Sequence, residues 1–114
     1  MIFGGGGFVG GNMARIALCA GWKVYIADSF YKAGVKDAVW KTVNITDRES
    51  VLSVIDEVRP DAVVNLAAIA DIDKAEREKE LAWSVNVEGA RYIAQACARF
   101  KAKYVFFSSD AVFD

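Results

Sequence analysis

Glycines at a regular spacing near the start of the chain are the first residues that could do chemistry. Gly4, Gly7 and Gly10 stand between a short apolar run and a segment with helical periodicity. In that context the first glycine makes a tight turn, the second lets a diphosphate touch the backbone, and the third brings the helix close to the sheet. The free N–H groups and the dipole of a helix N-terminus favour an anion there. The spacing therefore predicts a dinucleotide site, with Phe8 and Val9, which lie between the second and third glycines, as further contacts.

An acidic residue, Asp28, ends the next apolar segment. A carboxylate in this position can accept hydrogen bonds from both hydroxyls of an adenosine ribose, and it repels a 2′-phosphate. We therefore expect NAD(H) to be preferred, while Lys32 and Lys36 nearby keep NADP(H) as an alternative. The simpler interpretation of Asp28 is a solvated aspartate at the end of a strand.

The elements that must position these residues alternate between strands and helices. Strands are predicted at residues 1–3, 23–28, 40–45, 61–68 and 103–110. Helices are predicted at residues 11–21, 46–58 and 83–100. Buried strands that alternate with helices indicate parallel pairing with right-handed crossovers. We predict an α/β fold of the Rossmann type, a doubly wound parallel sheet with strand order 3-2-1-4-5 that is truncated after the fifth strand.

Two local predictions are specific. In the first helix, Met13, Ile16, Ala17 and Ala20 should lie on one side. In the second, Thr46 should cap the N-terminus as part of a capping box, and the helix should end before Pro60.

The composition indicates one globular domain, residues 1–114, with 54% hydrophobic and 25% charged residues. A net charge of −1 offers no field for nucleic acid or for an anionic membrane surface. The chain has no uncharged run of membrane-spanning length and no basic leader before an apolar stretch, so we expect a cytoplasmic protein. Without histidine, and with Cys19 and Cys97 far apart, no metal site is expected, and both thiols are predicted to be buried.

Further patterns can be read together with the glycines: Asn65-Leu66-Ala67-Ala68, Asn86, "DIDKAE" and "FSSDAVFD". As a set they resemble the extended short-chain dehydrogenase/reductase superfamily. Within it, "DIDKAE" and "SSDAVFD" are most similar to the dTDP-4-dehydrorhamnose reductase, or sugar-nucleotide reductase, branch. The likeness spans the whole chain, which corresponds to the N-terminal part of such an enzyme.

The resemblance implies cofactor contacts beyond the glycines. Asn44-Ile45 matches a site that holds adenine and usually reads aspartate followed by an apolar residue. The side-chain carbonyl of Asn44 is expected to accept a hydrogen bond from the exocyclic amine. Ala67 and Ala68 match small residues that lie against the cofactor ribose and nicotinamide, although a buried strand's own need for small residues explains them equally well.

The resemblance also implies catalytic and substrate contacts. Ser109 matches the serine or threonine whose hydroxyl contacts the C4 oxygen of the sugar, although a serine can simply end a strand. Asn86 matches the helix asparagine that orders a water-linked proton relay. Ile72 and Asp110 match residues of the sugar-nucleotide pocket, whereas Ala111 departs from the tyrosine that is usual in the branch.

The general acid of the superfamily, a tyrosine four positions before a lysine, is absent from this sequence. We therefore expect the dinucleotide-binding part of an NAD(P)-dependent oxidoreductase that transfers hydride at C4 of a nucleotide-linked sugar, nearly inactive alone. The alternatives are a sugar-nucleotide epimerase or dehydratase and a non-catalytic dinucleotide-binding module. Homo-oligomerisation is a further open alternative.

Overall fold

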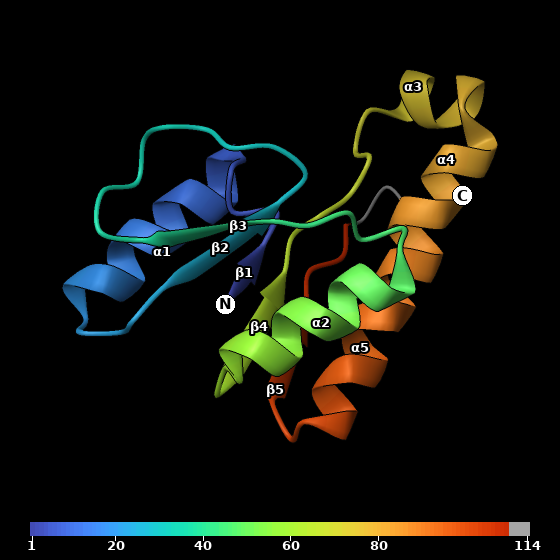
Figure 1. The fold of residues 1–114 in the computed structure, drawn as a ribbon. Coiled ribbons are helices and arrows are strands. Elements are labelled where there is room, and N and C mark those ends of the chain that lie inside the picture. The colour runs from blue at the N-terminus through green and yellow to red at the C-terminus, as the bar shows by residue number, and fades with distance from the viewer. Residues whose placement is uncertain (110–114) are drawn as a thin grey trace.

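A computed structural model describes residues 1–109 as a parallel five-stranded sheet with helices on both faces (Figure 1). The strands are β1 (Ile2–Phe3), β2 (Tyr25–Asp28), β3 (Val39–Thr42), β4 (Ala62–Asn65) and β5 (Lys103–Phe106). The helices are α1 (Phe8–Cys19), α2 (Arg48–Val58), α3 (Ile72–Arg77), α4 (Lys79–Trp83), the π-helical η1 (Ser84–Gly89) and α5 (Ala90–Arg99). The order β3-β2-β1-β4-β5 confirms the predicted doubly wound sheet.

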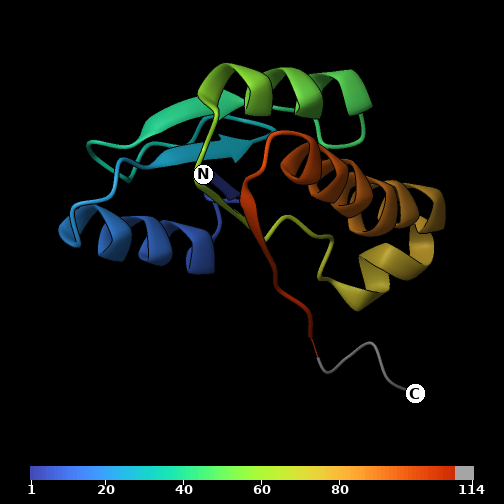
Figure 2. The ribbon, with the colours of Figure 1, turned by 90° about the horizontal axis from the view of Figure 1, so that it is seen from below.

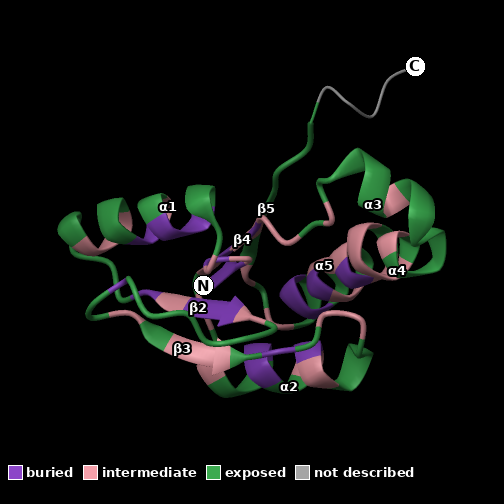
Figure 3. Cartoon of the chain, turned by 90° about the horizontal axis from the view of Figure 1, so that it is seen from above, coloured by how far each residue is buried: buried purple, intermediate pink, exposed green. Residues whose placement is uncertain are grey.

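Alternation along the strands divides the core between the two faces of the sheet. Ile2 belongs to the cluster that includes Ala14 of α1, whereas its neighbour Phe3 packs with Val51 of α2 and Ile93 of α5. Figure 2 shows α1 on one side of the sheet and α2 with α5 on the other. Each of these three helices turns its buried residues toward the sheet (Figure 3).

The predicted apolar side of α1 packs on the core only in part. The helix buries Gly10, Gly11 and Ala14, and Met13 and Ala17 pack against the core, while Ile16 is 71% exposed and Ala20 is also exposed. Ile16 lies two residues, and so about 200° around the helix, from Ala14. The close approach of Gly10 to the turn after β1 decides which side faces inward.

Helix α2 is capped by Asp47 and not by Thr46. The Asp47 carboxylate accepts a hydrogen bond from the Glu49 N–H at 3.1 Å. The Thr46 hydroxyl instead donates to the side-chain oxygen of Asn44, two residues earlier in the chain. The predicted end of the helix is confirmed, since Arg59 adopts the left-handed conformation with φ of 49° directly before Pro60.

The helix predicted at residues 83–100 is interrupted by a π-helical segment, η1. Within it, the Asn86 side chain accepts from the Ile69 N–H at 2.8 Å and donates to the Ile69 carbonyl at 3.1 Å. Gly89 provides the necessary room, because a Cβ there would lie 2.9 Å from side-chain atoms of Ile45. These tertiary contacts hold the irregular turn in place.

The two cysteines differ. Cys97 lies in the core on α5, and burial raises the pKa of its thiol to about 11. Cys19, the last residue of α1, is exposed, so the prediction of burial is wrong for this thiol.

None of the helices within residues 1–109 has both the length and the hydrophobicity that crossing a membrane requires.

Candidate functional site

A cleft of about 520 Å³ opens at the carboxyl ends of the strands, the edge at which open parallel sheets bind ligands. Its walls come from the turns that follow β1, β2, β3 and β4. The predicted cofactor residues that line it are Gly4, Gly7, Asp28, Asn44, Ile45, Ala67 and Ala68. The topology thus brings together residues from four separate parts of the sequence.

The structure gives a different reason for glycine at each of the three motif positions. Gly4 has φ of +75°, and a Cβ there would lie 2.7 Å from the backbone nitrogen of Ala67. A Cβ on Gly10 would lie 2.5 Å from the Gly4 carbonyl oxygen. At Gly7, in contrast, the only heavy atom that a Cβ would approach in the described chain is the Gly4 oxygen, at an ordinary 3.4 Å. Gly4 and Gly10 are therefore required by packing, whereas Gly7 leaves space beside the cleft.

The N-terminus of α1 begins at this open glycine. Gly7 is the N-cap, it offers no side-chain cap, and the first turn contains no acidic residue. The first N–H groups of a helix lack intrahelical acceptors, so this end suits an anion. Phe8 and Val9 are 87% and 52% exposed and lie outside the cleft lining within residues 1–109.

Asp28 joins the glycine turn to the end of β2. One carboxylate oxygen accepts from the Gly6 N–H at 2.9 Å, and the other accepts from the Ser29 N–H at 2.8 Å. The oxygen that faces Ser29 also accepts a long hydrogen bond from the Ser29 hydroxyl at 3.5 Å, whereas the oxygen that faces Gly6 can still accept a further hydrogen bond, and Asp28 lines the cleft. Gly6 is needed for this arrangement, because a Cβ there would lie 2.7 Å from the carboxylate. Gly6 falls outside the predicted glycine spacing, so its role emerges only from the structure.

Asn44 adopts an orientation that differs from the expected one. Its side-chain oxygen accepts from the Thr46 N–H at 3.0 Å and from the Thr46 hydroxyl at 2.7 Å. A carbonyl oxygen has two lone pairs, so both are engaged. An adenine amine would reach this oxygen only by replacing the hydrogen bond from the Thr46 hydroxyl, so the expected contact differs from the arrangement in the structure.

The turn after β4 is held by Asn65, a motif residue for which the sequence indicated no role of its own. This side chain is 1% exposed; its oxygen accepts from the Ala67 N–H at 3.0 Å, and its nitrogen donates to the Tyr104 hydroxyl at 3.2 Å. Burial raises the pKa of Tyr104, against a smaller lowering by the Asn65 hydrogen bond. Asn65 thus fixes the backbone that carries Ala67 and Ala68.

Other cleft residues carried no distinct sequence signal or were weighed only as neighbours. The remaining lining consists of Gly6, Ala27, Ser29, Phe30, Lys32, Val43, Thr46, Leu66, Ile69, Lys74 and Val85. Two of these, Lys32 and Lys74, bring cationic side chains to the cleft. Lys74 lies on α3, and the sequence "KAEREKE" that it begins is typical of a solvated helix start.

None of the predicted catalytic and substrate residues that the structure describes lines the cleft. Asn86 reaches the cleft through Ile69, whose backbone it holds. Ile72 begins α3 and is exposed, and Ser109 lies three residues past the end of β5. Neither belongs to the cleft lining within residues 1–109. Asp110 lies outside the described residues.

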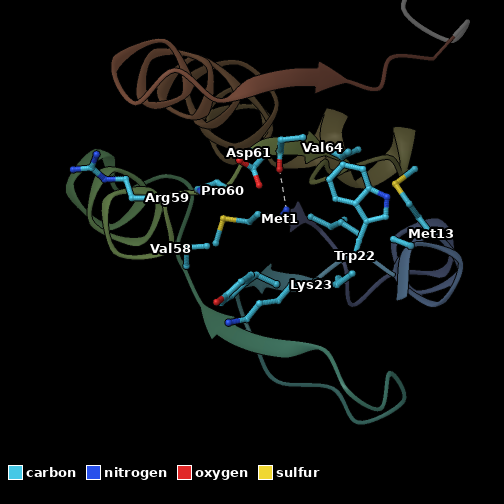
Figure 4. Close-up of a pocket in the computed structure, with 14 residues that line it drawn as sticks. Met1, Met13, Trp22, Lys23, Val58, Arg59, Pro60, Asp61 and Val64 are labelled. Atoms are coloured by element: carbon cyan, nitrogen blue, oxygen red, sulfur yellow. Dashed lines mark hydrogen bonds between the residues drawn. The ribbon is translucent and has the colours of Figure 1, made fainter. Parts of the chain in front are cut away.

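A second cavity, of about 430 Å³, lies at the opposite edge of the sheet (Figure 4). Trp22, Val58 and Val64 contribute to its apolar wall, and the Met1 amino group donates to the Ala62 carbonyl at 2.9 Å. None of the predicted site residues lines this cavity within the described part of the chain. Residues 1–109 also contain no group of three or more potential metal-ligating side chains.

Comparison with known proteins identifies the family. Residues 1–114 match the family described as "RmlD substrate binding domain". A dTDP-4-dehydrorhamnose reductase from Aggregatibacter actinomycetemcomitans is 33% identical over 100% of this chain and 35% of its own length. Another, from Streptomyces griseus, is 46% identical over 62% of this chain and 23% of its own length.

Solved structures agree with the fold. A UDP-glucose 4-epimerase from Thermus thermophilus, solved with NAD, has a TM-score of 0.87 and 27% identity over 95% of this chain and 36% of its own. A hypothetical dTDP-4-dehydrorhamnose reductase from Sulfolobus tokodaii has a TM-score of 0.80 and 28% identity over 99% of this chain and 40% of its own. The present chain thus spans about a third of the length of these proteins. Since the family match extends over all 114 residues, the chain belongs to the RmlD substrate-binding domain family.

Proposed function

We propose that this chain forms the dinucleotide-binding part of an NAD(P)-dependent oxidoreductase that transfers hydride at C4 of a nucleotide-linked sugar. The observation that carries the proposal is one cleft in which the open Gly7, the uncapped N-terminus of α1 and the Asp28 carboxylate meet. Family membership and the reductase relatives support the substrate class. Because those relatives are about three times as long, we propose that residues 1–114 are the N-terminal part of a longer polypeptide.

The residues present fit a dinucleotide. Gly7 and the first turn of α1 would bind the diphosphate, and Asp28 would accept hydrogen bonds from the ribose, which favours NAD(H). Asn44 and Ile45 would bind the base, and Ala67 with Ala68 would face the nicotinamide half. Lys32, also in the cleft, keeps NADP(H) as the alternative. When bound, the nicotinamide supplies or accepts the hydride.

On the substrate side, the Ser109 hydroxyl would donate to the C4 oxygen of the sugar. Asn86 would fix the Ile69 backbone at the wall of the cleft, and Ile72 and Asp110 would contact the sugar nucleotide. The tyrosine and lysine that protonate the C4 oxygen would come from outside these 114 residues. General acid–base assistance contributes about 10²–10⁴-fold, so the chain alone should be nearly inactive.

The test is dinucleotide binding by titration calorimetry with NADH and NADPH. Gly7 has extended backbone angles, φ −81° and ψ 178°, which valine adopts without strain, so Gly7→Val adds bulk beside the cleft and costs the fold about 1 kcal/mol as a poorer N-cap. Gly11→Ala, on the buried side of α1, is the control. We expect at least a ~10-fold loss of NADH affinity for Gly7→Val, unchanged circular dichroism, and normal binding by the control. Equal binding by Gly7→Val, or no binding by the wild type, would refute the proposal.

A second candidate, a sugar-nucleotide epimerase, is favoured by the high structural similarity to UDP-glucose 4-epimerase. A reductase must exchange its dinucleotide at each turnover, whereas an epimerase regenerates it in place. With the protein from its native source, net NAD(P)H oxidation by a 4-keto sugar nucleotide supports the reductase, and a dinucleotide retained through gel filtration supports the epimerase. An intact mass of 12.4 kDa without turnover supports a non-catalytic binding module.

A further inference from the structure

The turn after β4 forms one wall of the cleft, and two asparagine side chains hold its backbone. The Asn65 side-chain oxygen accepts from the Ala67 N–H at 3.0 Å, and the Asn86 side chain pairs with both backbone groups of Ile69. Ala67 and Ile69 both line the cleft. The Ala67 backbone also lies so close to the glycine turn that a Cβ on Gly4 would be 2.7 Å from the Ala67 nitrogen. A shift of this wall toward the glycine turn is therefore blocked, and any movement must be away from it.

A tyrosine on β5 connects the two anchored parts of this wall. The Tyr104 hydroxyl accepts a hydrogen bond from the Asn65 side-chain nitrogen at 3.2 Å and donates to the Ala90 carbonyl at 3.4 Å. Ala90 begins α5 and directly follows η1, the segment that carries Asn86. Asn65 is 1% exposed, so bulk water does not satisfy its amide if the hydroxyl is removed. The Tyr104 hydroxyl thus completes the hydrogen bonding of a buried side chain that itself holds the cleft wall.

We propose that Tyr104 is a positioning residue for the nicotinamide half of the dinucleotide, and that it acts through Asn65 on the backbone of Ala67. This inference rests on the proposed function, in which Ala67 and Ala68 face that half. Without the hydroxyl, an N–H of the Asn65 amide loses its partner in the core, and the amide gains by turning toward another acceptor. Turning the amide releases the Ala67 N–H, so the wall occupies its binding position for only a fraction of the time. The dissociation constant rises in inverse proportion to that fraction.

The experiment measures dissociation constants for NADH and for ADP by titration calorimetry on the whole chain. ADP has the adenosine and the diphosphate but lacks the nicotinamide half, so its affinity does not depend on the wall at Ala67. For Tyr104→Phe we expect the NADH affinity to be about 10-fold below that of the wild type, since one buried hydrogen bond corresponds to roughly that factor. The ADP affinity of the variant should stay within about 2-fold of the wild-type value.

The matched control is Tyr92→Phe, which removes a hydroxyl from the same part of the core. Tyr92 and Tyr104 are both partly buried and pack against the same cluster of buried residues. Among the described residues, however, the Tyr92 hydroxyl makes no hydrogen bond. Tyr92→Phe should therefore leave both dissociation constants at their wild-type values.

The comparison of the two ligands separates positioning from a general role in stability. If Tyr104→Phe binds NADH as tightly as the wild type, the inference is overturned while the proposed function stands. An equal loss of affinity for ADP and NADH, including the loss of both in a variant that does not fold, also overturns it, because Tyr104 would then support the whole fold. The same holds if Tyr92→Phe weakens NADH binding as much as Tyr104→Phe. If the wild type binds neither ligand, the proposed function and this inference fail together.

Discussion

Adjacent glycines in α1 provide a direct test of how closely this helix packs on the turn after β1. Gly10 and Gly11 are both buried. A Cβ on Gly10 would lie 2.5 Å from the Gly4 oxygen and 2.6 Å from the Gly5 Cα, both backbone atoms. The nearest atoms to a Cβ on Gly11 lie at 3.8 Å, an ordinary contact distance. Gly10→Ala and Gly11→Ala therefore make the same chemical change in opposite steric surroundings.

The two variants should change the free energy of unfolding in opposite directions. Replacing glycine by alanine in a helix contributes about 1 kcal/mol of stability, and this term is similar at both positions. At Gly10 the added methyl group must move the helix or the turn by about 1 Å to reach contact distance, and such overpacking costs about 3 kcal/mol where backbone lies on the other side. We expect Gly11→Ala to stabilise the fold by about 1 kcal/mol and Gly10→Ala to destabilise it by about 2 kcal/mol.

Urea unfolding followed by far-ultraviolet circular dichroism measures both values on the whole chain. The difference of about 3 kcal/mol is large compared with the error of such curves, and the shared propensity term cancels from it. If Gly10→Ala is as stable as Gly11→Ala, the helix does not approach the turn as closely as the structure shows. The packing explanation of the third motif glycine would then be wrong.

Three further predictions concern Asn86 and the two thiols. Asn86→Ala leaves the N–H and carbonyl of Ile69 without their partner and should lower the free energy of unfolding by about 1–3 kcal/mol in urea; an unchanged midpoint contradicts the assigned pairing. A disulfide reagent at about pH 8 should label Cys19 at once and Cys97 only after unfolding, since burial raises the Cys97 pKa to about 11; two equally fast labels argue against this. The unfolded thiol ionises at about pH 8.5, so stability should fall as the pH rises from about 9 to 11, by at most about 1.4 kcal/mol per pH unit. Cys97→Ala should remove that part of the pH dependence, and an identical profile for the variant would show that other groups cause it.

The sign of the pH effect follows from which state keeps the proton. Between the two pKa values the folded Cys97 remains protonated while the unfolded thiol has lost its proton, so the folded state binds more protons. Raising the pH therefore favours the unfolded chain. Below the unfolded pKa both states are protonated, and the full contribution of the buried neutral thiol is present.

The amino-acid pattern alone determined the fold class. The apolar strands and their alternation with helices led to a parallel sheet with the correct strand order. The glycine spacing and Asp28 indicated the edge of the sheet at which the cleft lies. These features could be predicted because they depend on local periodicity and on residue types that are rare outside particular turns.

The tertiary structure decided the features that depend on contacts between distant residues. The interruption of the helix around Asn86 depends on Ile69, which belongs to another segment, and the local sequence carries no sign of it. The exposure of Ile16 follows from how close Gly10 brings α1 to the turn. Helical periodicity gives a spacing of apolar residues, but the direction in which they face is set by the packing of the whole helix.

Asn44 shows the same difference between what the sequence predicts and what the structure decides, here at the site itself. Its position after the third strand, and hence its place in the cleft, could be read from the sequence. The atom of its amide that Thr46 engages, the oxygen, is known only from two hydrogen bonds in the structure, because an asparagine offers a donor and an acceptor at nearly the same place. Sequence therefore determined which residues gather at the cleft, and three-dimensional geometry decided what each of them presents there.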